Sequence, residues 1–257
     1  MLYLIAAIIV LILIGYFIFS QPKKKPSAGP QQEAGHKALL EQHVAYYQKL
    51  NPEEKQRFVL QVESFLQDTR IEGVGLELEN LDRVLIAASA IVPIFGFKDW
   101  HYPNLTSVIL YPDTFNNDFQ FEGGNREIAG MVGSGFMNGQ MLLSRAALRK
   151  GFSASAGEEN TAIHEFVHLL DKEDGATDGL PEQLMPHEYT APWVKMIHGE
   201  IKKIEAGKSD INPYAITNEA EFFAVVSEYF FEKPEKFRQK HPELYEMLCI
   251  IFIQKPV

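Results

Sequence analysis

The sequence predicts an α+β fold in which helices come first, a small sheet follows, and further helices complete the domain. Apolar residues recur at helical spacing in the first and last thirds of the globular part, whereas the middle holds two short apolar runs typical of strands. The length of 257 residues is sufficient for one sizeable domain. Helices segregated around a small central sheet favour an α+β domain over a doubly wound parallel sheet.

The first twenty residues form a separate segment. Residues 2–19 are apolar and uncharged, and they are long enough to cross a bilayer core as one helix. A cleavable signal peptide carries its positive charge before the apolar core, whereas here three lysines follow it at 23–25. We therefore expect a transmembrane anchor at 1–20, a flexible linker at 21–35 that is rich in Pro, Lys, Gln and Gly, and a globular domain at 36–257.

The elements of the globular domain follow from local patterns. Proline at position 52, directly after Asn51 and before two acidic residues, indicates a helix start, and Pro93 should end the helix before it. Amphipathic or buried helices are expected at 37–49, 51–65, 81–91, 192–203, 218–231 and 242–253. Strands are expected at 107–111 and 140–144, with turns and short strands in the glycine-rich stretch 123–139.

The segment 164–168 reads H-E-F-V-H and lies in an apolar run at helical spacing, with Asn160 or Thr161 as its cap. Two residues four apart lie on one face of a helix, so the imidazoles of His164 and His168 can reach one metal ion. Glu165 then lies beside the metal, as a base for a zinc-activated water requires. The alternative is a helix with two core histidines and a solvated glutamate, but such a charged cluster is costly to bury without a metal.

A catalytic zinc ion requires a third protein ligand. The position that holds a third histidine in the extended motif is Asp174 here, so we expect a glutamate from the later helix instead. Glu219 and Glu221 point about 200° apart on a helix, so only one of them can bind the same metal, and spacing alone does not choose between them. Asp171, three residues after His168, is placed to orient an imidazole, to cap a helix or to be solvated.

The H-E-F-V-H motif, taken with Y-A-I-T-N-E-A-E-F-F-A from position 214, resembles the catalytic domain of anthrax lethal factor. The string E-A-E-F-F-A-V-V-S-E-Y-F-F from position 219 is similar to the Mlc titration factor A (MtfA) family of bacterial zinc peptidases. The resemblance spans roughly residues 40–250 and implies a zincin-like metallopeptidase domain of the gluzincin type, with one zinc ion per chain. It implies that Glu221 binds this zinc and that Tyr214 stands by the reacting carbonyl. The apolar segment at 2–19 is a departure from the soluble members.

These patterns favour a membrane-anchored zinc peptidase that hydrolyses a peptide or protein substrate, with Glu165 as general base. One alternative, which the resemblance implies, is a zinc-containing regulatory binding protein that sequesters a partner such as a transcriptional repressor. Another is a purely structural zinc site, but such a site has no need of a base at position 165. The formal charge of −10 argues against nucleic acid as a partner.

The charge pattern also predicts the topology of the membrane segment. The lysines directly after the apolar span place everything that follows in the cytoplasm, as a single-pass protein of the inner (cytoplasmic) membrane of a bacterium. The lone Cys249 agrees with a reducing compartment. A carboxyl-terminal reporter that is active only in the cytoplasm should therefore give a signal. A signal only from a reporter that is active outside the cytoplasm would reverse this topology.

Overall fold

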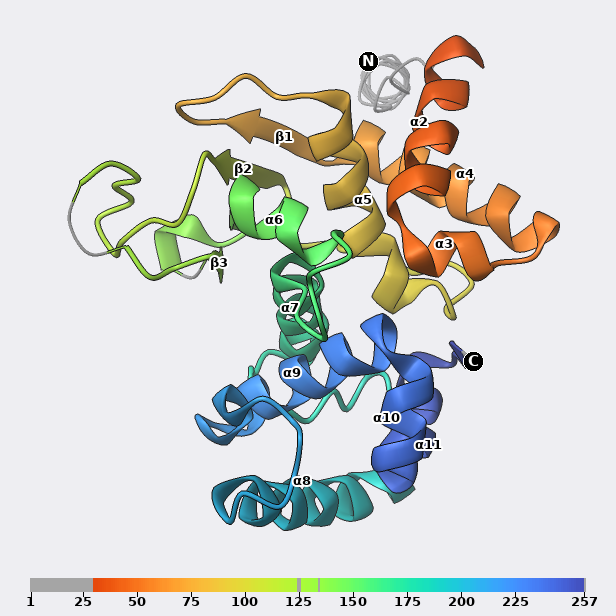
Figure 1. Ribbon diagram of the computed structural model, residues 1–257, viewed down its shortest axis with the longest axis vertical. Coiled ribbons are helices and arrows are strands. Elements are labelled where there is room, and N and C mark those ends of the chain that lie inside the picture. Colours follow the sequence, from red (N-terminus) through yellow and green to blue (C-terminus); the bar gives the residue numbers. More distant parts are fainter. Residues whose placement is uncertain (1–29, 124–125, 134, 257) are drawn as a thin grey trace, which may run out of the picture.

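The computed structural model describes residues 30–123, 126–133 and 135–256. A small sheet and helices α2 to α6 form one part of the domain, and α8 to α11 form the other (Figure 1). Helix α7 (Thr161–Asp171) lies between these two parts (Figure 1). The α+β class expected from the sequence is confirmed, because the chain is rich in helices and contains one small mixed sheet.

The sheet has the strand order β1-β2-β4-β3. Strand β2 is parallel to β1 and to β4, whereas β3 is antiparallel to β4 and forms an edge of the sheet. The strands are β1 (Arg70–Gly73), β2 (Ser107–Tyr111), β3 (Gly130–Val132) and β4 (Gln140–Ser144). The expected strands coincide with β2 and β4, and β3 falls in the glycine-rich stretch. Strand β1 was not expected, since its four residues are too few to show an alternation.

The amino-terminal helices differ from the expectation in two respects. Helix α2 (Pro30–His43) begins inside the expected linker 21–35, so that residues 30–35 are helical and the linker prediction is wrong there. The single helix expected at 37–49 is interrupted at Val44, which has an extended backbone with φ −111° and ψ 96° and a buried side chain. A β-branched residue tolerates this conformation well. Helix α3 (Ala45–Lys49) follows, and α4 (Pro52–Asp68) begins with the capping box of Asn51 and Glu54.

Helix α5 (Asn80–Ile94) is almost entirely buried and runs through the centre of its part of the domain. The expected end before Pro93 is wrong, because the helix includes Pro93 and ends one residue later. The side-chain amide of Gln254 donates hydrogen bonds to the carbonyl oxygens of Val92 and Pro93, at 3.0 and 3.1 Å. These bonds satisfy carbonyls that the end of the helix leaves without an intrahelical donor.

The remaining helices build the second part of the domain and join it to the sheet. Helices α6 and α10 were not expected, because seven residues are too few for helical periodicity to be recognised. The α-helices are α6 (Arg145–Gly151), α8 (Thr190–Glu205), α9 (Glu219–Glu232), α10 (Pro234–Lys240) and α11 (Pro242–Phe252). The short 3-10 helices are η1 (Gly135–Met137), η2 (Lys172–Asp174), η3 (His187–Tyr189) and η4 (Pro213–Ile216).

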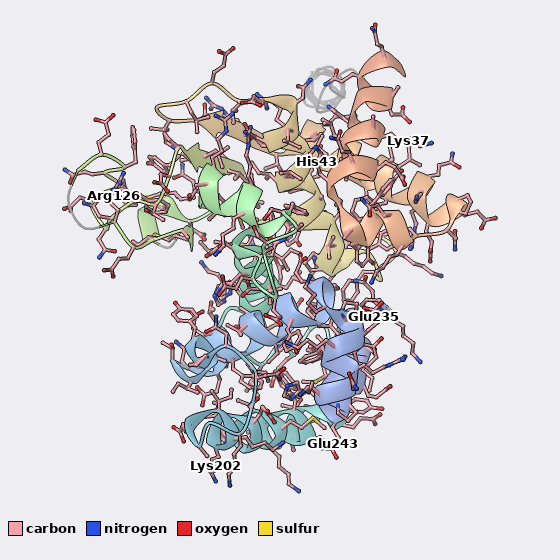
Figure 2. The ribbon with its side chains drawn as sticks, in the orientation of Figure 1. Lys37, His43, Arg126, Lys202, Glu235 and Glu243 are labelled. Carbon is pink, nitrogen blue, oxygen red and sulfur yellow. The ribbon has the colours of Figure 1, made fainter. Side chains whose placement is uncertain are left out.

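Helix α7 is fixed in the core by aromatic contacts to elements that precede it in the chain. The Phe166 ring lies 5.8 Å from the ring of Phe65 in α4 and 5.2 Å from that of Tyr102. On the other side of the domain, the indole of Trp193 in α8 donates to the Gly179 carbonyl oxygen at 2.7 Å. Charged side chains project from the outside, as with Lys37 of α2 and Lys202 of α8 at opposite ends of the molecule (Figure 2).

Among residues 30–123, 126–133 and 135–256, no helix is both long enough and apolar enough to cross a membrane. The anchor expected at 1–20 lies outside the described residues, as do residues 21–29 of the expected linker.

Candidate metal centre

The histidine pair is positioned by the capped start of α7. The side chain of Asn160 accepts a hydrogen bond from the Ile163 amide at 3.3 Å, so Asn160 rather than Thr161 is the cap. The helix is buried along nearly its whole length. His164 and His168 consequently share one face, with their Nε2 atoms 3.0 Å apart and their rings almost perpendicular, at 84°.

The third side chain of the cluster comes from α9. Asn218 caps this helix by accepting a hydrogen bond from the Glu221 amide at 2.8 Å. The Oε2 atom of Glu221 lies 2.9 Å from Nε2 of His164 and 3.4 Å from Nε2 of His168. Glu219, the other candidate, is half exposed and lies 3.5 Å from the exposed His198, away from the pair. The fold therefore brings Glu221, and not Glu219, to the two imidazoles.

These three side chains fit a zinc ion. One nitrogen from each imidazole and one oxygen of Glu221 all lie within 4.8 Å of one another, and two histidines with a carboxylate are a catalytic zinc set. Ligand atoms about 2.0–2.1 Å from a tetrahedral zinc are roughly 3.3 Å apart, which is close to the spacings found here.

A further carboxylate contacts the ring nitrogen of His164 that does not face the cluster, and so orients the imidazole. Glu228 Oε1 lies 2.8 Å from Nδ1 of His164, while its Oε2 accepts a hydrogen bond from the backbone amide of Asn160 at 2.5 Å. A proton held on Nδ1 directs the lone pair of Nε2 toward the cluster, which is how outer carboxylates tune metal-bound histidines. Glu228 was not identified from the sequence. Its signal was its position seven residues after Glu221, two turns along the same helical face.

Asp171 is fully buried, and in the described part of the chain its side chain neither caps a helix nor hydrogen-bonds an imidazole. Its carboxylate accepts a hydrogen bond from the Gly179 amide at 2.9 Å and so fixes the loop after η2. In the described part of the chain, neither its Oδ1 atom nor Nδ1 of His168 has a hydrogen-bond partner. Burial raises the pKa of the Asp171 carboxyl to about 6, against the hydrogen bond from Gly179.

The electrostatics of the cluster favour positive charge between its members. Burial alone lowers the pKa of the His164 imidazole, but hydrogen bonds to Glu221 and Glu228 outweigh burial and raise it above its usual value. Burial alone raises the pKa of the Glu221 carboxyl, and the hydrogen bonds with both histidines overcome this and hold it well below its usual value. Each shift has the sign expected of carboxylates that hold a cation at the imidazoles.

Glu165 lies beside the cluster, against the edge strand. It is only 6% exposed, and burial raises the pKa of its carboxyl. A Cβ atom on Gly130 of β3 would stand 2.6 Å from its Oε1, so only glycine allows the strand and the carboxylate to approach this closely. Gly130 is the second contributor to the site that the sequence did not reveal.

Tyr214 stands at the mouth of the site on η4. The residue is 53% exposed, and its ring lies 6.1 Å from that of His164. Partial burial, followed by the charge of Glu221, raises the pKa of its hydroxyl, so the phenol keeps its proton at neutral pH. The cavity here has a volume of about 380 Å³. Besides the histidines, Glu165, Tyr214 and Glu221, it is lined by β3 together with Lys172, Thr177, Asn218 and Ala220.

Comparison with known proteins gives matches over most of the chain. A family model described as Glucose-regulated metallo-peptidase M90 matches residues 20–252. Mlc titration factor A of Escherichia fergusonii is 33% identical over 222 residues, which cover 81% of this chain and 82% of the relative. The protein of the same name from Klebsiella pneumoniae is 30% identical over 222 residues, with 81% and 82% covered. These matches confirm the resemblance to the Mlc titration factor A family that the two motifs indicated.

The two candidate glutamates can be separated by metal binding. We expect Glu221→Gln to weaken zinc binding by more than about 100-fold, because it removes an anionic ligand atom from the cluster. Glu219→Gln is the matched control and should bind zinc like the wild type. Competition with a chromophoric chelator measures both affinities. A loss of zinc in Glu219→Gln that is absent from Glu221→Gln would show that the ligand is assigned to the wrong residue.

The role of Glu228 predicts a smaller effect on the same measurement. Glu228→Gln keeps the size of the side chain but removes the charge that holds a proton on Nδ1 of His164, so zinc affinity should fall by about 10- to 100-fold. Glu232→Gln is the control, because Glu232 also lies on α9 and accepts a hydrogen bond from the Asn160 side chain at 2.8 Å, but among the described residues it forms no hydrogen bond or ion pair with His164. Equal affinities in the two variants would contradict this role.

Proposed function

Because the chain belongs to the glucose-regulated metallo-peptidase M90 family, we propose that it is a zinc-dependent peptidase of the gluzincin type. One observation carries the proposal. The ligand atoms of His164, His168 and Glu221 converge in a cavity whose wall holds Glu165, a buried carboxylate outside the ligand set. A structural zinc site would be closed by four protein ligands, whereas this described cluster has three and opens to the cavity.

Each side chain of the site has a separate role in the proposed hydrolysis. When bound by His164, His168 and Glu221, zinc supplies Lewis acidity, which polarises the scissile carbonyl and activates water. Glu165 takes a proton on its carboxylate from the attacking water and passes it to the leaving amine. Its raised pKa suits both halves of this transfer. Tyr214 keeps its phenolic proton and donates a hydrogen bond to the oxyanion that develops on the substrate.

The edge strand supports a peptide as substrate. Strand β3 pairs with β4 on one side only within the described sheet, and its three residues line the cavity beside Glu165. An extended peptide can pair with the free edge through main-chain hydrogen bonds, which bind a peptide largely without regard to its sequence. The close approach of Gly130 to Glu165 would then bring one peptide bond beside the base.

A second candidate function is sequestration of a regulatory protein. The relatives from E. fergusonii and K. pneumoniae are named for titration of Mlc. We carry over from this name the proposal that the chain also binds a regulator, with the zinc site intact. For location we propose that residues 2–19 anchor the domain at the cytoplasmic face of the inner membrane, on the charge pattern alone.

Removal of the base tests the proposed chemistry. Glu165→Gln should retain zinc and lose most peptide hydrolysis, since the proton acceptor is gone while the ligands remain. Tyr214→Phe should also retain zinc and lose roughly ten- to a thousandfold in rate, the range for one oxyanion donor. A digest of a peptide library, with and without chelator, measures the activity. Unchanged turnover in Glu165→Gln would reject the mechanism, and no turnover by the wild type would favour sequestration.

A further inference from the structure

We propose that Lys172 selects peptides that carry a carboxylate two or three residues from the scissile bond. This inference rests on the proposed peptidase function and names the substrate class of the same site. It concerns a residue with no part in holding the metal or in the proton transfer.

Lys172 lines the metal cavity and has no anionic partner among the described residues. Its ammonium lies 3.3 Å from the carbonyl oxygen of Gly133 and 3.4 Å from Oδ1 of Asn138, which are long contacts to neutral acceptors. Within the described residues it forms no salt bridge, and it is the one lysine or arginine on the cavity wall. A partly buried ammonium with only weak neutral acceptors retains capacity for a carboxylate.

The rest of the cavity would repel a carboxylate. Glu165 and Glu221 line it, and Glu228 lies directly behind His164, so these three carboxylates leave a net negative charge even around a zinc ion of charge +2. A peptide with an acidic group close to the reacting bond therefore meets like charge, unless that group reaches Lys172. The charge distribution along the cavity therefore favours an acidic group of the substrate at the end where Lys172 lies.

The edge strand β3 gives the approximate distance between Lys172 and Glu165. Gly130 stands against Glu165, and Gly133 accepts the contact from Lys172. Three residues of extended chain span roughly 10 Å. A peptide paired with β3 that places its scissile bond at Glu165 therefore brings a residue two or three positions away to Lys172.

A purely structural role for Lys172 makes a different prediction. Its contacts with Gly133 and Asn138 also tie the end of α7 to the segment between β3 and β4. If Lys172 only holds these two segments together, its replacement should change the hydrolysis of all peptides equally. A selecting ammonium would affect acidic and neutral peptides differently, and its effect should reverse with the sign of the charge at position 172.

The test uses the full zinc-loaded chain and a set of matched peptides. Each peptide differs from a parent by one Gln→Glu or Gln→Lys change, at two or three residues on either side of the cleaved bond. Each is made with a free and with an amidated carboxyl terminus, which separates an acidic side chain from a chain-end carboxylate. The wild type should prefer the carboxylate by roughly two- to fivefold in kcat/KM at one of these positions, an ordinary effect for one partly exposed ion pair.

The variants at position 172 decide the outcome. Lys172→Gln should abolish the preference, and Lys172→Glu should reverse it in favour of lysine, while both keep wild-type zinc affinity. Lys202→Glu is the control, because this exposed lysine lies on α8 at the outside of the domain (Figure 2) and should leave the preference unchanged. An equal loss on every peptide, or a preference that survives Lys172→Gln, would overturn the proposal.

A binding measurement separates this inference from the peptidase function. If the wild type cleaves no peptide, the proposed function fails, and selection is then measured as the affinity of the zinc-loaded protein for the same intact peptides. Tighter binding of the acidic peptides that depends on the charge at position 172 would support selection without catalysis. Equal affinity for acidic and neutral peptides would overturn it in that case also.

Discussion

The contact between α7 and α9 is the constraint on which the site depends. One helix presents both histidines and Glu165, and the other presents Glu221 together with Glu228. Both helices are buried along most of their length, and each begins at an asparagine whose side chain caps the first turn. The Asn160 amide also donates to Glu228, so the start of α7 is bound to the side of α9. Rotation of either helix by one residue would separate the ligand atoms.

The negative charge of the glutamates at the contact between α7 and α9 explains why a cation stabilises it. Glu165, Glu221 and Glu228 are all at least half buried, and two neutral imidazoles cannot balance three carboxylates. Burying uncompensated charge costs far more than burying a paired one, so a positive charge between the imidazoles lowers the free energy of the whole cluster. Protons can supply that charge, as the raised pKa of His164 indicates, and a divalent ion fits the same position with better geometry.

The sequence was sufficient for features that depend on local spacing and insufficient for those that depend on how helices rotate against each other. The motif helix and strands β2 and β4 were predictable from residues near in the chain, whereas the cap of the helix was narrowed only to Asn160 or Thr161. The choice between Glu219 and Glu221 was not, because only packing of α9 on α7 decides which face is inward; the family resemblance supplied it instead. Glu228 became visible only once Glu221 was chosen. Two helix boundaries were wrong. Val44 is extended and interrupts the helix that apolar spacing predicted, and α5 continues through Pro93 to an end where the Gln254 amide satisfies its carbonyls.

The same geometry connects the candidate metal cluster to the end of the cavity. Lys172 directly follows α7, where a cation interacts favourably with the carboxyl-terminal end of the helix dipole. That interaction accounts for a positive charge at this position but does not require the side chain to face the cavity. Four residues of helix separate it from His168, a rise of about 6 Å. Because Lys172 directly follows the helix that carries His168, a carboxylate held by Lys172 would lie near the ligand atoms of the cluster, and recognition at one end of a peptide would help to set the position of the bond at the other.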